Sequence, residues 1–155
     1  MISEELANTL IENPAVSREE VEDVYRDPEY PVFMVEADAV ADVCRFLRDT
    51  EGYEFNFIKN LTAVDFEEHM HVVYHLYSMN LRHKIMLKVQ VGREQPVVRS
   101  VESVWRSADW QEREVFDLFG IKFAGHPDLR RIMLPEDWQG YPLRKDYVHE
   151  PDHYD

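Results

Sequence analysis

Cysteine is almost absent from this 155-residue sequence, which contains only Cys44. One thiol cannot form an internal disulfide, and it cannot supply the roughly four thiolates that usually hold an iron–sulfur cluster. Basic residues are also scarce, because 17 Lys and Arg stand against 31 Asp and Glu, which gives a net charge of −14. This deficit argues against nucleic-acid binding, which depends on cationic contacts to phosphates. It argues equally against electrostatic attachment to anionic lipid.

Long apolar runs are missing as well. No stretch approaches the roughly 18 apolar residues that indicate a membrane span. Residues 1–5 (MISEE) lack the basic and then apolar pattern of a signal peptide. We therefore expect a soluble protein, and the shortage of cysteine fits a reducing compartment such as the cytoplasm.

Apolar and aromatic residues are plentiful, and the charge is unevenly placed. Hydrophobic residues make up 45% of the chain, enough for one domain of this length to bury a core without a metal or disulfide. Residues 1–68 carry a net charge of −13, residues 69–108 carry +4, and residues 109–155 carry −5. The first segment predicts a solvated acidic face. The last is dense in both signs, which is typical of paired charges or of a surface that meets another protein.

The first part of the chain predicts short elements. A helix runs from Ser3, which can cap it, to about residue 11. Residues 17–27 predict a second, highly charged helix or a loop. Residues 32–35 (VFMV) are typical of a strand, and Asp38 is expected to cap a helix that runs to about residue 48.

The middle of the chain predicts an antiparallel sheet. Cys44 lies on the apolar face of the preceding helix and is expected in the core, without chemistry of its own. Residues 61–66 predict a strand. Residues 70–78 and 84–91 show the clearest alternation of apolar and polar side chains, with a turn between them, and predict a paired hairpin.

A helix follows the sheet. Ser107 or Asp109 is placed to cap it, and the spacing of Asp109 and Glu112 is that of a capping box. The helix is expected to end at about Phe119, with Gly120 as the stop. This order of elements predicts an α+β fold, a two-layer domain with helices packed on a mixed β-sheet.

The C-terminal residues predict an extended arm rather than a disordered tail. Neither helical nor strand periodicity persists from residue 121 to 147, yet this stretch is rich in aromatic and aliphatic residues, which disordered tails usually lack. A long structureless segment in a small domain is usually functional. The arm therefore either folds back over its own sheet or lies along another protein, and different portions can do each. Its alternating Arg and acidic residues favour an interface, where Arg, Trp and Tyr are enriched.

We divide the chain accordingly into three parts. Residues 1–30 form a variable acidic N-terminal segment, residues 31–120 the α+β core domain, and residues 121–155 an extended, partner-wrapping C-terminal arm.

Three histidines, His69, His71 and His75, are the first candidates for chemistry. His71 and His75 share one face of the predicted strand, and His83 can approach from the neighbouring strand. A zinc site needs further ligands and no cysteine pair is available. A polar strand face, solvated or covering a partner, is therefore the favoured interpretation.

Carboxylates of the last helix are the second candidates. Glu114 and Asp117 are three residues apart and share a helix face, so they could act as an acid–base pair or as metal ligands. Arg113 lies four residues before Asp117 and is expected to pair with it, which favours a structural charge network. His126 has no accompanying nucleophile or phosphate-binding loop. A stand-alone metal-dependent hydrolase built from His71, His75, Glu114, Asp117 or His126 is the alternative function that these residues allow.

The C-terminal third resembles a known family. Residues 112–121 (EREVFDLFGI), 123–132 (FAGHPDLRRI) and 135–147 (PEDWQGYPLRKDY) strongly resemble the 30-kDa subunit of respiratory complex I, the C subunit of bacterial NADH:quinone oxidoreductase. Residues 61–65 (LTAVD) and 73–76 (VYHL) are similar to its upstream segments. The resemblance is to the stand-alone form, not to the version fused to the 49-kDa subunit.

The resemblance implies a subunit without a catalytic, cofactor-binding or metal-binding residue of its own. FMN, iron–sulfur clusters, NADH and quinone would be bound by other subunits. The implied partners are the 49-kDa (D) subunit and the neighbouring 20-kDa (B) and 23-kDa (I) iron–sulfur subunits, on the cytoplasmic side of the cell membrane. The residues carried over as family signature or interface are Glu112, Arg113, Glu114, Asp117, Phe119, Gly120, His126, Arg130, Arg131, Trp138, Arg144, Lys145 and Tyr147. The equivalent subunit of a related membrane-bound hydrogenase or formate-hydrogenlyase complex is the alternative.

Overall fold

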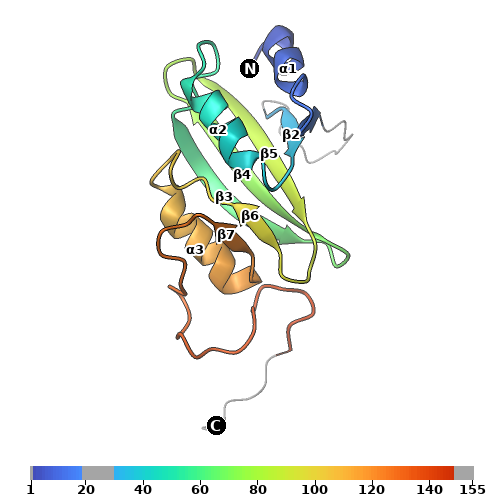
Figure 1. The fold of residues 1–155 in the computed structure, drawn as a ribbon, viewed down its shortest axis with the longest axis vertical. Helices are drawn as coiled ribbons and strands as arrows, with labels where there is room; N and C mark the ends of the chain where they lie inside the picture. Colours follow the sequence, from blue (N-terminus) through green and yellow to red (C-terminus); the bar gives the residue numbers. More distant parts are fainter. Residues whose placement is uncertain (1, 19–29, 149–155) are drawn as a thin grey trace.

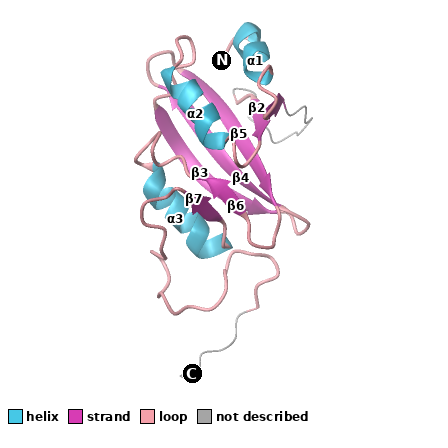
Figure 2. Ribbon diagram, in the orientation of Figure 1, coloured by secondary structure: helices cyan, strands magenta, loops and turns pink. Residues whose placement is uncertain are grey.

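A mixed five-stranded sheet lies at the centre of the molecule, with helices on one of its faces (Figures 1 and 2). The computed structural model describes residues 2–18 and 30–148. The elements in chain order are α1 (Glu4–Ile11), β1 (Val16–Arg18), β2 (Val32–Val35), α2 (Val40–Asp49), β3 (Phe57–Asp65), β4 (Met70–Ser78), β5 (His83–Val91), β6 (Val97–Arg99), α3 (Ala108–Phe119) and β7 (Lys122–Ala124).

The strands of the large sheet are ordered β1-β2-β5-β4-β3. β3, β4 and β5 pair antiparallel, so that Leu61, Tyr74 and Leu87 lie side by side across the sheet. β2 joins β5 in parallel, and β1 closes the other edge antiparallel to β2. A separate parallel pair, β6 and β7, brings residues 97–99 beside residues 122–124. The predicted α+β fold with helices on a mixed sheet is confirmed.

One hydrophobic core lies between the sheet and the helices. Val43 and Cys44 of α2 and Val115 of α3 join it from the helical layer, and Tyr74 and Leu87 from the sheet. Cys44 is fully buried, as predicted, and burial raises the pKa of its thiol. Such a thiol is inert at neutral pH.

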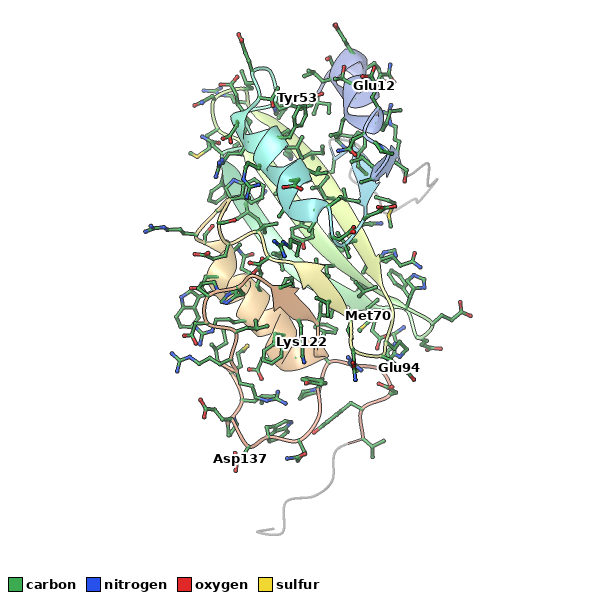
Figure 3. The ribbon with its side chains drawn as sticks, in the orientation of Figure 1. Glu12, Tyr53, Met70, Glu94, Lys122 and Asp137 are labelled. Atoms are coloured by element: carbon green, nitrogen blue, oxygen red, sulfur yellow. The ribbon has the colours of Figure 1, made fainter. Side chains whose placement is uncertain are left out.

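The N-terminal helix belongs to the same body. Ile2 and Leu10 are buried in the core. The Tyr53 hydroxyl, at the upper end of the molecule in Figure 3, donates a 2.7 Å hydrogen bond to the Leu6 carbonyl. The predicted cap is confirmed, because Ser3 Oγ accepts from the Leu6 amide at 3.2 Å.

Several predicted boundaries differ from the structure. The hairpin strands match closely, but β3 begins at Phe57, four residues earlier than predicted. A β-bulge between Ile58 and Asn60 interrupts the alternation that marks a strand, which explains the miss. α2 begins after Ala39, so the expected cap at Asp38 is wrong. Of the predicted segment 17–27, the first two residues belong to β1 and the rest lies outside the described residues.

The start of α3 also differs. Ser107 occupies the cap position without a side-chain hydrogen bond to the helix, and the predicted capping box is wrong. Glu112 instead points into the core, where it accepts from Ser100 Oγ at 2.6 Å and from the Val101 amide at 2.7 Å. These groups satisfy a carboxyl that has no solvent exposure, and they tie α3 to the segment that follows β6. The predicted stop is confirmed, since Gly120 has a left-handed φ of 76°.

Candidate functional site

The C-terminal arm leaves β7 and continues to residue 148 without helix or strand (orange to red in Figure 1). It first runs beside α3 and then bends away before returning to the lower end of the sheet. In Figure 3, Lys122 marks β7 and Asp137 the far bend. β7 itself is part of the domain, because Phe123 is buried and the strand pairs with β6. Two buried aspartates hold the arm in this path.

Asp117 of α3 is the first anchor and is fully buried. Its Oδ2 accepts from the amides of Ile132, Met133 and Leu134 at 3.2, 2.7 and 3.0 Å. Its Oδ1 lies 2.8 Å from Arg131 Nη1. Burial favours the neutral acid, but these donors outweigh burial, and the pKa of Asp117 is lowered. The carboxylate therefore fixes four consecutive residues of the arm.

Arg131 extends this anchor into the rest of the arm. Its Nη2 donates to the carbonyls of Trp138 and Gly140 at 3.1 and 2.9 Å, and its Nη1 also reaches the Asp117 carbonyl. The predicted pairing of Arg113 with Asp117 is wrong. Arg113 instead donates to the Arg130 carbonyl, and its guanidinium lies 5.0 Å from the ring centre of Trp110. Arg113 could give Asp117 only one partner, whereas the arm gives it four donors, three of them backbone amides.

Asp65, at the end of β3, is the second anchor. It forms a bidentate pair with Arg93 and accepts from the amides of Glu67 and Lys145 at 2.8 and 2.9 Å. The Arg93 guanidinium, helped by these amides, holds the pKa of Asp65 well below its usual range. The Asp146 carboxylate lies 3.0 Å from the same guanidinium. The returning end of the arm is thus tied to the β3–β4 turn.

Between the anchors, the arm packs on the end of α3. The Leu143 amide donates to the Leu118 carbonyl at 3.0 Å, and Arg144 donates to the carbonyls of Phe119 and Arg93. The Tyr141 ring covers Gly120 so closely that an added Cβ would lie 2.5 Å from it. Glycine is therefore needed there for the backbone conformation and for the space.

The next three predicted site residues, Glu112, Glu114 and His126, lie in different surroundings. Burial raises the pKa of Glu112 to about 7, against the hydrogen bonds from Ser100 and Val101. Glu114 is exposed while Asp117 is buried, so the two do not form an acid–base pair. His126 Nε2 lies 2.8 Å from Asp109 Oδ1, and its Nδ1 accepts from the Asp128 amide at 3.0 Å.

The histidines lie in separate environments. His71 lies 4.9 Å from His69, centre to centre, whereas His75 contacts Tyr30 edge-on at 5.3 Å. His83 Nε2 lies 2.6 Å from the Tyr53 carbonyl. Within residues 2–18 and 30–148, no group of three or more His, Cys, Asp or Glu side chains is placed to hold a metal ion.

Three exposed apolar residues were not among the predicted site residues. Trp110 on α3 is 64% exposed, and Met133 and Leu143 on the arm are 60% and 53% exposed. In the sequence, Trp110 falls on the polar stripe of the predicted helix with Arg113 and Asp117, and an aromatic residue on that stripe is the signal that could have identified it.

Comparison with known proteins decides the family. Residues 33–153 match the family model described as "Respiratory-chain NADH dehydrogenase, 30 Kd subunit". The chain belongs to this family. The C subunit of NADH-quinone oxidoreductase from Roseiflexus sp. (strain RS-1) is 50% identical over 115 residues, which is 72% of this chain and 66% of that protein. Its counterpart from Salinispora tropica is 39% identical over 148 residues, which is 93% of this chain and 60% of that protein. This chain therefore spans less than two thirds of the length of these relatives.

Two solved structures are similar to this chain in fold. A chain of the membrane-bound sulfane sulfur reductase, an archaeal respiratory membrane complex, has a TM-score of 0.74 and 27% identity, and the match covers 94% of this chain and 85% of that one. A trypsin-resistant fragment (1-134) of Nqo5 has a TM-score of 0.58 and 28% identity, covering 83% of this chain and all of that one. Among the described residues, no helix has the length and hydrophobicity needed to cross a membrane.

Proposed function

We propose that this chain is a structural subunit of the peripheral arm of a proton-pumping NADH:quinone oxidoreductase. It carries no redox centre itself and docks on the 49-kDa (D) subunit, next to the 20-kDa (B) and 23-kDa (I) iron–sulfur subunits, on the cytoplasmic side of the membrane. The observation that carries the proposal is the family match over residues 33–153, which includes the arm as well as the domain.

The geometry of the arm supports a docking role. The carboxylates of Asp117 and Asp65 accept hydrogen bonds from backbone amides and pair with arginines of the same chain. Such groups shape a surface rather than act on a substrate. The arm carries exposed apolar side chains, among them Met133 and Leu143, which a partner could cover.

Truncation after Leu129 tests the proposal. The shortened chain keeps β6, β7 and α3, so it should fold, and the solved 1-134 fragment of Nqo5 is a precedent in a relative. We expect the shortened chain to accumulate in soluble form but to be absent from the complex purified through a tag on another subunit. The measurement is the amount of this chain recovered with the complex. Undiminished recovery of the folded, shortened chain would overturn the docking role.

A second candidate is the equivalent subunit of a related membrane-bound respiratory complex with another electron donor, of the hydrogenase or formate-hydrogenlyase type. The similarity to a chain of the sulfane sulfur reductase favours it, because the same fold serves in a complex with that name. Peptide mass spectrometry of the co-purified proteins separates the candidates. NADH-oxidising, flavin-binding partners would support the first proposal, and a nickel-containing or sulfur-reducing partner the second.

A further inference from the structure

Several charged side chains beside α3 have partners within the chain, while Glu114 is exposed. Asp117 is bound by Arg131, Asp109 lies against His126, and the exposed Arg130 pairs with Asp128 at 3.0 Å. These residues lie where the arm runs beside the helix. A partner that adds its own charges to the Asp117–Arg131 and Asp128–Arg130 pairs gains little.

Large apolar groups are exposed on this surface as well. Trp110 and Asp117 are seven residues apart on one helix stripe, about 10 Å along the axis. The Met133 amide is bound to Asp117, so Met133 lies near the far end of the stripe. Trp110 is 64% exposed at the near end and Met133 60% exposed. The guanidinium of Arg113 lies over the Trp110 ring and supports it from within the chain.

We infer that Trp110 and Met133 are the anchors by which this surface docks, and that these two side chains fit an apolar pocket on the partner protein. Exposed tryptophan is the residue type most enriched at interface hot spots. This assignment reverses the expectation that the arginines of the arm contact the partner, because Arg131 and Arg144 are engaged by carbonyls and carboxylates of their own chain. The inference rests on the proposed docking function and names the chemistry of its contact.

Competition in the cell tests the inference. A tagged full-length variant is expressed beside the untagged wild-type chain, and the tagged-to-untagged ratio in the purified complex is divided by the ratio in the soluble pool. Division by the soluble pool corrects for any loss of folded protein. We expect Trp110→Ala to lower this quotient at least about tenfold, and Met133→Ala about threefold or more.

Two matched controls separate apolar anchoring from other effects. Met79→Ala removes an equally exposed methionine, 62% exposed on the β4–β5 turn, and should leave the quotient unchanged. Arg130→Ala removes a charge on the docking surface itself and should change it less than about twofold. Washing the purified complex with about 500 mM rather than about 50 mM salt should release no additional chain, because apolar contacts are not screened.

The outcomes are distinguishable. A normal quotient for Trp110→Ala, a loss with Arg130→Ala as large as that with Trp110→Ala, or release of the chain by salt would each overturn the inference. If the chain truncated after Leu129 is excluded from the complex while Trp110→Ala enters normally, only the apolar anchors are wrong. If the truncated chain also enters normally, the proposed function fails with them.

Discussion

At the scale of single residues, Asp117 fixes the course of the arm where it runs beside α3. Its carboxylate accepts from three consecutive amides and pairs with Arg131. The sequence places an acid on a helix face but does not identify its donors, which come from residues 14 to 17 positions later. The natural expectation, a partner four residues away, was wrong for this reason.

Substitution of this group has a defined cost. Asp117→Asn removes the charge that Arg131 faces and turns an amide NH2 toward backbone donors. We expect a loss of about 2–4 kcal/mol in the free energy of unfolding, measured by chemical denaturation. Hydrogen exchange at the amides of residues 132–134 should become faster. Asp128→Asn, at an exposed pair, should change neither measurement, and equal effects from both variants would contradict the anchor role.

For Glu112 we predict a pH dependence of stability that is opposite in sign to the one expected for Asp117. Its pKa is raised by burial from 4.5 to about 7 in the folded chain, so the folded state holds its proton more tightly than the unfolded state. The stability from this group is fully present below pH 4.5 and is lost as the pH rises through about 7. The lowered pKa of Asp117 acts in reverse, and its contribution is lost as the pH falls below about 4.

Glu112→Gln should therefore flatten the fall in stability between about pH 5 and about pH 8, because glutamine has no proton to lose in that range. Thermal unfolding across this range, compared between variant and wild type, measures the slope. Glu114→Gln is the matched control at an exposed position of the same helix. An unchanged slope in Glu112→Gln would show that this carboxyl is not the group responsible.

At the scale of elements, the sequence predicted the strands whose side chains alternate regularly along the chain. The hairpin of β4 and β5 was predicted almost to the residue because its apolar side chains alternate without a break. The parallel pair of β6 and β7 was not predicted. Each strand has three residues, and their pairing depends on contacts across more than twenty residues of sequence. The first four residues of β3 were not predicted either, because the bulge interrupts the alternation of apolar and polar side chains that the rest of the strand shows.

The junction of α3 and the arm depends on one glycine. In Gly120→Ala, the positive φ would strain the new residue and its Cβ would displace the Tyr141 ring. We expect a loss of about 1–3 kcal/mol in the free energy of unfolding. Gly92→Ala is the matched control, because no atom lies within 4 Å of its added Cβ. Similar losses in both variants would exclude a specific contact between Gly120 and Tyr141.

At the scale of the whole molecule, the net charge of −14 and the uncovered apolar residues have opposing effects. Like charge keeps copies of the chain apart, whereas Trp110 and Met133 favour association. The arm was predicted either to fold on its own domain or to lie along another protein. The structure shows the first for its anchored backbone, and the exposed side chains leave room for the second.

The isolated chain should therefore associate as salt is added. At about 50 mM salt we expect a monomer, and at about 500 mM screening of the repulsion should allow weak self-association. Sedimentation velocity measures the change. The double variant with Trp110→Ala and Met133→Ala should remain monomeric at both concentrations, and association that persists in this variant would point to another surface.

The positions of the two anchoring aspartates along the chain have a consequence for synthesis. Asp65 and Asp117 both precede the residues they hold, by 80 positions to Lys145 and by 15 to 17 to residues 132–134. Because a ribosome releases the N-terminal part first, the receptor for the arm exists before the arm emerges. The arm can then settle on a finished surface as it is translated. A chain that terminates before residue 131 instead leaves the Asp117 carboxylate without its four donors, whereas Asp65 loses only the Lys145 amide and keeps Arg93.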